Sequence, residues 1–332
     1  MKQCMPEIRS TNQTLLHNYH RSMAFNWKTF KTRALTAIIF AAVMLTGLLW
    51  NQWSFLILIS VIHFGCWREY FKLIEKIHKT SYHWLTRFGF MVFGFAIILR
   101  SCGTQFQIGD FRLQEKLPIP VSIVGVIMLV LGIFATKKID LKASGSAALG
   151  LLYISMTWGM MVSLYTSEVI ESTINHPVPD IVNTVIYDIS KAWLIPLIIV
   201  CSIWINDTMA YIVGSLIGKR PLSKISPKKT WEGTIGGIIL ATITTGLIFS
   251  NINADIIRSD FHFEFSTAPL YIIAAIAAIF GTFGDLIESK LKRMAGVKDS
   301  GNLMPGHGGF LDRFDSMLLA IPAVWVYVYY FL

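Results

Sequence analysis

Residues 268–287 read APLYIIAAIAAIFGTFGDLI, an apolar run that carries a single acid close to its end. A helix rises about 1.5 Å per residue, so about 20 such residues cross about 30 Å of hydrocarbon. The whole chain has this character, because 54% of its 332 residues are hydrophobic and only 15% are charged. Soluble globular proteins carry roughly 45–50% apolar and about 25% charged residues. The composition therefore predicts an all-α, polytopic integral membrane protein.

The same composition excludes several other classes of protein. Intrinsic disorder requires low hydrophobicity and abundant charge, and both are missing. The four cysteines, Cys4, Cys66, Cys102 and Cys201, are too few for a secreted disulfide scaffold and form no Cys-x-x-Cys pair. A net charge of +9 suggests nucleic acid in a soluble protein, but in a membrane protein basic residues report first on topology. We expect no nucleic-acid partner.

Nine apolar runs are candidates for membrane-spanning helices. They lie near Ala34–Trp50, Trp53–Cys66, Phe88–Leu99, Pro118–Ala135, Ser144–Tyr165, Ala192–Gly218, Gly233–Ser250, Ala268–Ile287 and Met317–Leu332. The second and third runs are short, and only Asn51 and Gln52 separate the first two, so that pair can also be a hairpin or a re-entrant element. We expect about nine transmembrane helices.

Basic residues are distributed unequally among the connecting stretches. The stretches 1–33, 67–87, 136–143, 219–231 and 289–315 hold 24 of the 29 Lys and Arg residues, and the stretches 100–117, 166–191 and 251–266 hold the rest. Cytoplasmic loops carry the excess of Lys and Arg. The asymmetry and the odd number of runs predict a cytoplasmic N-terminus and a C-terminus on the opposite side.

The runs and loops divide the chain into three regions. We expect a cytoplasmic tail at 1–33, N-terminal transmembrane helices at 34–191, and a C-terminal catalytic region at 192–332 with cytoplasmic loops 219–231 and 289–315. The polar tail is not followed by a signal-peptide pattern, so we expect it to stay attached as a loosely ordered extension.

Four acids, Asp207, Glu232, Asp285 and Glu288, lie inside or at the ends of apolar runs. A carboxylate in hydrocarbon costs about 2.5–3.5 kcal/mol, so each needs a partner, a water-filled cavity or a function. Glu232 and Glu288 are also explained as acids at the membrane interface, and Glu288 can pair with Lys292 one turn later. Asp207 and Asp285 can face one cytoplasmic cavity. Hard oxygen ligands without a nearby Cys or His pair favour Mg²⁺.

The loop between Gly218 and Gly233 holds five cations and no acid before Glu232. A cytoplasmic location alone explains the positive charge of this loop. However, Ser226, Lys228 and Lys229 also precede a helix start, where hydroxyl, ammonium and backbone N–H groups bind anions. The segment 214–220 superficially resembles a phosphate-binding loop. Its spacing is one residue short and Arg220 stands where Ser or Thr is needed, so that interpretation is rejected.

The stretch 289–315 concentrates the remaining polar chemistry. If it extends the helix of Asp285, then Ser289, Lys292 and Arg293 follow that acid along one face. Farther on, glycines surround His307, and Asp312 and Asp315 lie three residues apart where the last run begins. Carboxylates for a divalent ion and cations for oxyanions at a membrane surface indicate polyphosphate chemistry on a lipid. The residues alone do not identify the nucleotide.

The same stretch closely resembles the signature of the phosphatidate cytidylyltransferases, also called CDP-diacylglycerol synthases. The matching residues are Ser289, Lys292, Arg293, Lys298, Asp299, Gly301, Pro305, His307, Gly308, Gly309, Asp312, Arg313 and Asp315. Met304 is the one departure, since the family usually carries Leu, Ile or Phe there. Segments 206–211, 226–233 and 284–285 also look like family motifs, so the specific resemblance covers roughly residues 200–316.

The resemblance implies that CTP and phosphatidic acid react to CDP-diacylglycerol and pyrophosphate, with Mg²⁺, at the cytoplasmic face of the cell (inner) membrane. By this analogy Asp285 leads the metal ligands, with Asp207, Asp312 and Asp315 as further candidates. The catalytic candidates are Asp285, Lys292, Arg293, His307, Asp312 and Arg313. The substrate-binding candidates are Ser226, Lys228, Lys229, Ser289, Lys298, Gly308 and Gly309. Whether the protein forms a homodimer is left open.

Two other functions compete with this one. A CTP-dependent lipid kinase of the polyprenol or phytol type has a similar architecture but releases CDP instead of pyrophosphate. A membrane ion transporter can use Asp207 and Asp285 as intramembrane ion sites, but it predicts a site near the bilayer midplane, often between internal repeats. The polar groups here gather toward one side and the sequence shows no repeat.

Overall fold

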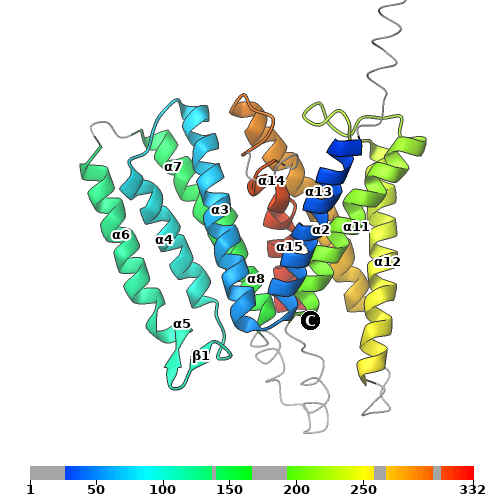
Figure 1. The fold of residues 1–332 in the computed structure, drawn as a ribbon, viewed down its shortest axis with the longest axis horizontal. Coiled ribbons are helices and arrows are strands. Elements are labelled where there is room, and N and C mark those ends of the chain that lie inside the picture. The colour runs from blue at the N-terminus through cyan, green and yellow to red at the C-terminus, as the bar shows by residue number, and fades with distance from the viewer. Residues whose placement is uncertain (1–26, 137–139, 167–192, 258–266, 302–307) are drawn as a thin grey trace, which may run out of the picture.

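The computed structural model describes residues 27–136, 140–166, 193–257, 267–301 and 308–332, and these are almost entirely helical (Figure 1). The only strands in these residues, β1 (Gln107–Ile108) and β2 (Phe111–Arg112), form an antiparallel hairpin. The helices are α2 (Trp27–Leu49), α3 (Gln52–His78), α4 (Trp84–Arg100), α5 (Leu113–Lys116), α6 (Pro118–Phe134), α7 (Leu141–Gly150), α8 (Thr157–Tyr165), α11 (Leu194–Ile217), α12 (Trp231–Ile257), α13 (Ala268–Met294), α14 (Leu311–Phe314) and α15 (Met317–Phe331). A π-helical segment, η1 (Leu151–Met156), joins α7 to α8. The all-α prediction is therefore confirmed.

Every one of the nine apolar runs is occupied by helix, but the second run is longer than its hydropathy indicates. Helix α3 continues through residues 67–78, which the sequence interpretation had assigned to a connecting stretch. Its start is fixed by Asn51, whose side-chain oxygen accepts a hydrogen bond from the Ser54 backbone N–H at 2.8 Å, while Ser54 Oγ accepts one from the Asn51 N–H at 3.1 Å. This reciprocal cap satisfies two N–H groups that the helix itself leaves free.

Within the described residues, five helical segments are long and apolar enough to cross a membrane. They are Leu141–Tyr165, Leu194–Ile217, Trp231–Ile252, Ala268–Met294 and Leu311–Phe331. Two shorter apolar helices lie at Ala34–Leu49 and Pro118–Phe134. A protein with several membrane spans is thus supported, and the total of nine crossings stays a prediction.

The helices form two neighbouring groups (Figure 1). Helices α11, α12 and α13 pack on one another on one side, while α3, α4, α6 and α7 lie on the other. Helices α8 and α15 contact each other between the two groups. Trp158 of α8 also meets Phe314 of α14 edge to face at 5.6 Å. The Thr157 hydroxyl also donates to the Leu318 carbonyl at 3.2 Å. The two halves therefore share one apolar core.

Several connections lie at the same end of the bundle (Figure 1). The ends of α3 and α13 and the segment between α11 and α12 are at the upper end in that view, and the β1–β2 hairpin and the C-terminus are at the lower end. The basic stretches 67–87, 219–231 and 289–301 therefore lie toward one face, as their charge predicts. Most of the expected tail at 1–33 and of the stretches 166–191 and 251–266 lies outside the described residues.

Candidate functional site

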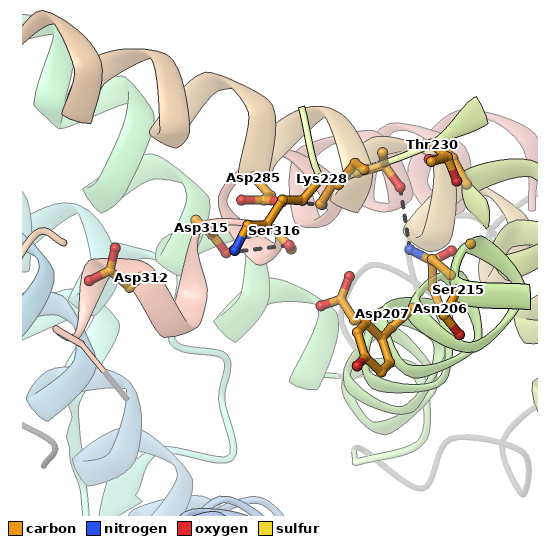
Figure 2. Close-up of a pocket in the computed structure, with 15 residues that line it drawn as sticks. Asn206, Asp207, Ser215, Lys228, Thr230, Asp285, Asp312, Asp315 and Ser316 are labelled. Atoms are coloured by element: carbon orange, nitrogen blue, oxygen red, sulfur yellow. Dashed lines mark hydrogen bonds and ion pairs between the residues drawn. The ribbon is translucent and has the colours of Figure 1, made fainter. Parts of the chain in front are cut away.

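A cavity of about 440 Å³ lies between α11, α13, the segment before α12 and the start of α15. Among its lining residues are six of the predicted site residues: Asp207, Lys228, Lys229, Asp285, Asp312 and Asp315. Figure 2 shows Asp285 and Asp315 close together, with Asp207 facing them from α11 and Asp312 to one side. The structure thus brings together charged residues from segments more than 100 positions apart in the sequence.

Helix α11 is held against α13 by two polar contacts inside the bundle. The buried Asn206 donates through Nδ2 to Thr282 Oγ1 at 3.3 Å, and the buried Ser202 hydroxyl donates to the Ala274 carbonyl at 2.7 Å. Asn206 faces α13, and both it and the next residue, Asp207, line the cavity. These contacts fix the distance between the acid of α11 and those of α13.

Helix α13 approaches the start of α15 closely because residue 284 is a glycine. A Cβ atom at Gly284 would lie 2.5 Å from the Asp315 carbonyl oxygen, so any larger residue would force the helices apart. This approach brings Asp285, Glu288 and Asp315 together, with one oxygen of each within 4.8 Å of the others. Glu288 is fully buried and Asp315 is 8% exposed. Three converging carboxylates have the donor chemistry that a hard divalent cation requires.

The basic loop between α11 and α12 folds back on itself. The Leu222 N–H donates to the Lys229 carbonyl at 2.7 Å, and the Trp231 N–H donates to the Arg220 carbonyl at 2.9 Å. Glu232 accepts hydrogen bonds from the N–H groups of Lys219 and Arg220 at 3.1 and 3.2 Å. Glu232 therefore holds the loop and does not line the cavity.

Lys229 forms an ion pair with Asp285 across the cavity. Burial alone lowers the pKa of Lys229, but the neighbouring Asp285 carboxylate more than offsets this effect and raises the pKa above its ordinary value. Lys229 is therefore fully charged at neutral pH. The adjacent Lys228 also lines the cavity and is exposed, so the loop presents two cations to it.

Asp312 has a different environment from the other acids. Its Oδ1 accepts a hydrogen bond from Lys292 Nζ at 2.6 Å, and its Oδ2 accepts from the N–H groups of Ser300 and Gly309 at 2.9 and 2.8 Å. Lys292 is also ion-paired with Glu288, as the spacing of these two residues predicts. Asp312 thus joins Lys292, Ser300 and Gly309, and its assignment as a metal ligand stays a prediction.

The remaining candidates lie around this centre. Ser289 Oγ donates weakly to Asp285 Oδ1 at 3.4 Å, and the Ser226 carbonyl accepts from the Lys229 N–H at 3.1 Å. Arg293 and Lys298 are exposed, and Arg313 is partly buried with its Nε lacking a hydrogen-bond partner in the described part of the chain. Gly308 and Gly309 precede α14. His307 lies outside the described residues.

Sequence reasoning missed two acids of this region. Glu288 had an ordinary explanation as an interfacial acid, but it is a member of the acidic group. Glu69 of α3 is 4% exposed and accepts hydrogen bonds from Ser300 and Leu311, yet it had been assigned to a connecting stretch. At helical spacing Glu69 falls on the same face as the apolar Ile62, Cys66 and Leu73, which was a signal that helical periodicity could have found.

Comparisons with known proteins identify the relatives of this chain. The profile of the cytidylyltransferase family matches residues 31–331. Phosphatidate cytidylyltransferase of Staphylococcus haemolyticus is 46% identical over 121 residues, which are 36% of this chain and 43% of that protein. Phosphatidate cytidylyltransferase of Bacillus subtilis is 44% identical over 124 residues, which are 37% of this chain and 43% of that protein.

The matched segment therefore spans less than half the length of these curated relatives, whereas the family profile extends over nearly the whole chain. Because that profile covers both the N-terminal helices and the acidic cavity, the chain belongs to the cytidylyltransferase family.

Proposed function

We propose that this protein is a phosphatidate cytidylyltransferase, which converts CTP and phosphatidic acid to CDP-diacylglycerol and pyrophosphate. The observation that carries the proposal is the convergence of Asp207, Asp285 and Asp315 with Lys228 and Lys229 on one cavity. The names of the relatives from Staphylococcus and Bacillus support the choice of substrates.

The reaction matches what these residues can do. A phosphate oxygen of the lipid attacks the α-phosphorus of CTP, the bond to the bridging oxygen of the β-phosphate breaks, and pyrophosphate leaves. A phosphate monoester is already largely ionised near pH 7, so no general base is needed. Catalysis then rests on orienting two polyanions and neutralising their charge, which Lys228, Lys229 and Lys292 perform.

The acidic group fits Mg²⁺ as the cofactor. Asp285 and Asp315, with Glu288 beside them and Asp207 across the cavity, would hold the ion through carboxylate oxygens. When bound, the ion supplies charge neutralisation and polarisation of the phosphoryl oxygens. Asp285 and Asp315 both belong to the acidic group and line the cavity. The resemblance of segment 284–285 to a family motif makes Asp285 the leading ligand in this proposal.

The membrane arrangement is part of the proposal. The chain crosses the cell (inner) membrane nine times, with the N-terminus and the cavity facing the cytoplasm and the catalytic region formed by residues 192–332. The location of the basic loop at the same end of the bundle as the end of α13 supports this arrangement (Figure 1). We treat the homodimer as a separate hypothesis, which crosslinking in native membranes would test.

One assay tests the function directly. Purified protein is incubated with radiolabelled CTP, phosphatidic acid and Mg²⁺, and the products are separated into lipid and water-soluble fractions. We expect the label in the lipid and one pyrophosphate released per lipid formed. Release of labelled CDP would instead support the lipid-kinase alternative, and CTP left intact, with ion flux in proteoliposomes, would support the transporter.

We expect Asp285→Asn to abolish synthesis of CDP-diacylglycerol at any Mg²⁺ concentration. The substitution keeps the size of the side chain but removes the charge, and the loss of such an electrostatic contact costs about 10²–10³ in rate. Initial rates and thermal unfolding in detergent would be measured together, with Glu232→Gln as the matched control, because Glu232 binds only loop amides. More than about a tenth of the parental rate in Asp285→Asn would show that the assignment is wrong.

We expect Lys228→Ala and Lys229→Ala to raise the KM for CTP or for phosphatidic acid, with a smaller effect at high salt because charge attraction is screened there. Lys224→Ala is the control, since Lys224 lies in the same loop but does not line the cavity. Michaelis curves for each substrate would be recorded at two salt concentrations. Unchanged KM values for both substrates would leave the loop with a role in topology alone.

Sidedness can be measured with cysteine labelling in intact cells. In a background with Cys4, Cys66, Cys102 and Cys201 replaced by alanine, Asp110→Cys in the turn of the hairpin should react with a membrane-impermeant thiol reagent. Ser223→Cys in the basic loop should react only after the membrane is permeabilised. The reverse pattern would contradict a cytoplasmic cavity.

A further inference from the structure

Glu69 is an acid of the N-terminal half that the proposed chemistry does not use. It lies on α3, where its neighbours on the buried face include Cys66, Trp67 and Tyr70, and only 4% of its surface is exposed. No cation of the described residues forms an ion pair with it. Burying a carboxylate is costly unless hydrogen bonds compensate for the lost water. Such a residue requires a specific partner.

That partner is the segment 300–311, a part of the signature that lies more than 200 residues later in the chain. Glu69 Oε2 accepts a hydrogen bond from Ser300 Oγ at 2.7 Å and one from the Leu311 N–H at 2.8 Å. Ser300 lies at one end of the segment 300–311, and Leu311 lies at the other end, where α14 begins. One carboxylate oxygen therefore joins both ends of the segment to α3.

Two glycines of the signature leave the space that this carboxylate occupies. A Cβ atom at Gly301 would lie 2.1 Å from Glu69 Oε1, and one at Gly309 would lie 2.2 Å from Oε2. Real Cβ atoms do not approach oxygen so closely, so any side chain at either position would displace Glu69 or the segment. The carboxylate of Glu69 on α3 thus explains sterically why the motif has glycine at these two positions.

The contact leads on to the cavity. Ser300 Oγ lies 2.9 Å from Asp312 Oδ2, and Asp312 in turn accepts the hydrogen bond from Lys292. Glu69 itself is not among the residues that line the cavity, whereas Asp312 is. Glu69 can therefore affect chemistry through Ser300 or Leu311, both of which lead to Asp312.

We propose that Glu69 is a positioning residue, whose carboxylate clamps both ends of the segment 300–311 and thereby holds Asp312 and Lys292 in place at the cavity. The role in turnover rests on the proposed cytidylyltransferase function, but the clamp itself does not. By this proposal the N-terminal helices contribute to the catalytic geometry as well as to anchorage in the membrane.

Substitutions of Glu69 test the role in turnover on purified full-length protein. We expect Glu69→Ala to lower kcat by about 10–100-fold, the usual effect of removing a group that orients the residues of a metal site, with a smaller change in KM. Glu69→Gln keeps an oxygen that can accept both hydrogen bonds, so we expect it to recover most of the lost kcat. Glu75→Gln is the control, because Glu75 lies on the same helix but binds Arg87 and the Tyr82 N–H.

A steric double variant tests the clamp without relying on activity. Gly301→Ala should lower the thermal unfolding temperature, and adding Glu69→Ala should restore part of the loss because the collision is removed. Independent sites would instead give additive losses.

The two readouts separate the two hypotheses. If the losses in unfolding temperature of the two variants are non-additive but the parent protein makes no CDP-diacylglycerol, the clamp stands and the proposed function is contradicted. Additive unfolding losses, or a folded Glu69→Ala protein whose kcat stays within about threefold of the parent, would overturn the positioning role.

Discussion

The ion pairs around Asp285, Glu288 and Asp312 are the constraint on which the rest of the structure depends. Carboxylates within a membrane-embedded bundle are tolerated only when cations, hydrogen bonds or water compensate them. Lys229 supplies the charge for Asp285, and Lys292 supplies it for both Glu288 and Asp312. These lysines come from two different segments, so the segments must meet at one place. The close approach of α13 to α15 at Gly284 and the folded basic loop bring these two segments together.

This constraint also explains why the N-terminal helices and the catalytic region share one core. The two ends of the segment 300–311 are secured by polar contacts to Glu69 and Asp312. Helix α3 can offer Glu69 at that point because the two halves pack together, with Trp158 of α8 against Phe314 of α14. Packing of apolar side chains beside the cavity thus helps to determine where its charged groups lie.

Much of this arrangement could be predicted from the sequence. The nine apolar runs predicted the positions of the helices, because hydropathy reports directly on burial in lipid or core. The spacing of Glu288 and Lys292 predicted their ion pair, since residues four apart on a helix are neighbours. The grouping of Asp207 and Asp285 followed from their places near the same end of separate runs, whereas Asp315 was added by the family resemblance. The first inferences depend on local periodicity, and the last depends on a known motif.

The contacts that escaped prediction are those between distant segments. Hydropathy ended the second run at Cys66, because Arg68, Glu69 and Lys72 lower the average, and Glu69 was therefore placed in a connection. Nothing in the sequence near residue 69 specifies that Ser300 will be its partner. Similarly, Asp312 and Asp315 look equivalent in the motif, and only the tertiary structure separates the one that binds Lys292 from the one beside Asp285.

The balance of charge around the cavity gives a reason for a divalent cation that is independent of the resemblance. Within the described part of the chain, the acids that line the cavity or pair beside it are Asp207, Asp285, Glu288, Asp312 and Asp315, and the corresponding lysines are Lys228, Lys229 and Lys292. Arg313, whose guanidinium interacts electrostatically with Asp207, adds a fourth positive charge. If all are ionised, five negative charges face four positive ones, so the carboxylates are in excess. A divalent cation held by these carboxylates would offset that excess, which is the charge condition for admitting a polyanion such as a nucleoside triphosphate.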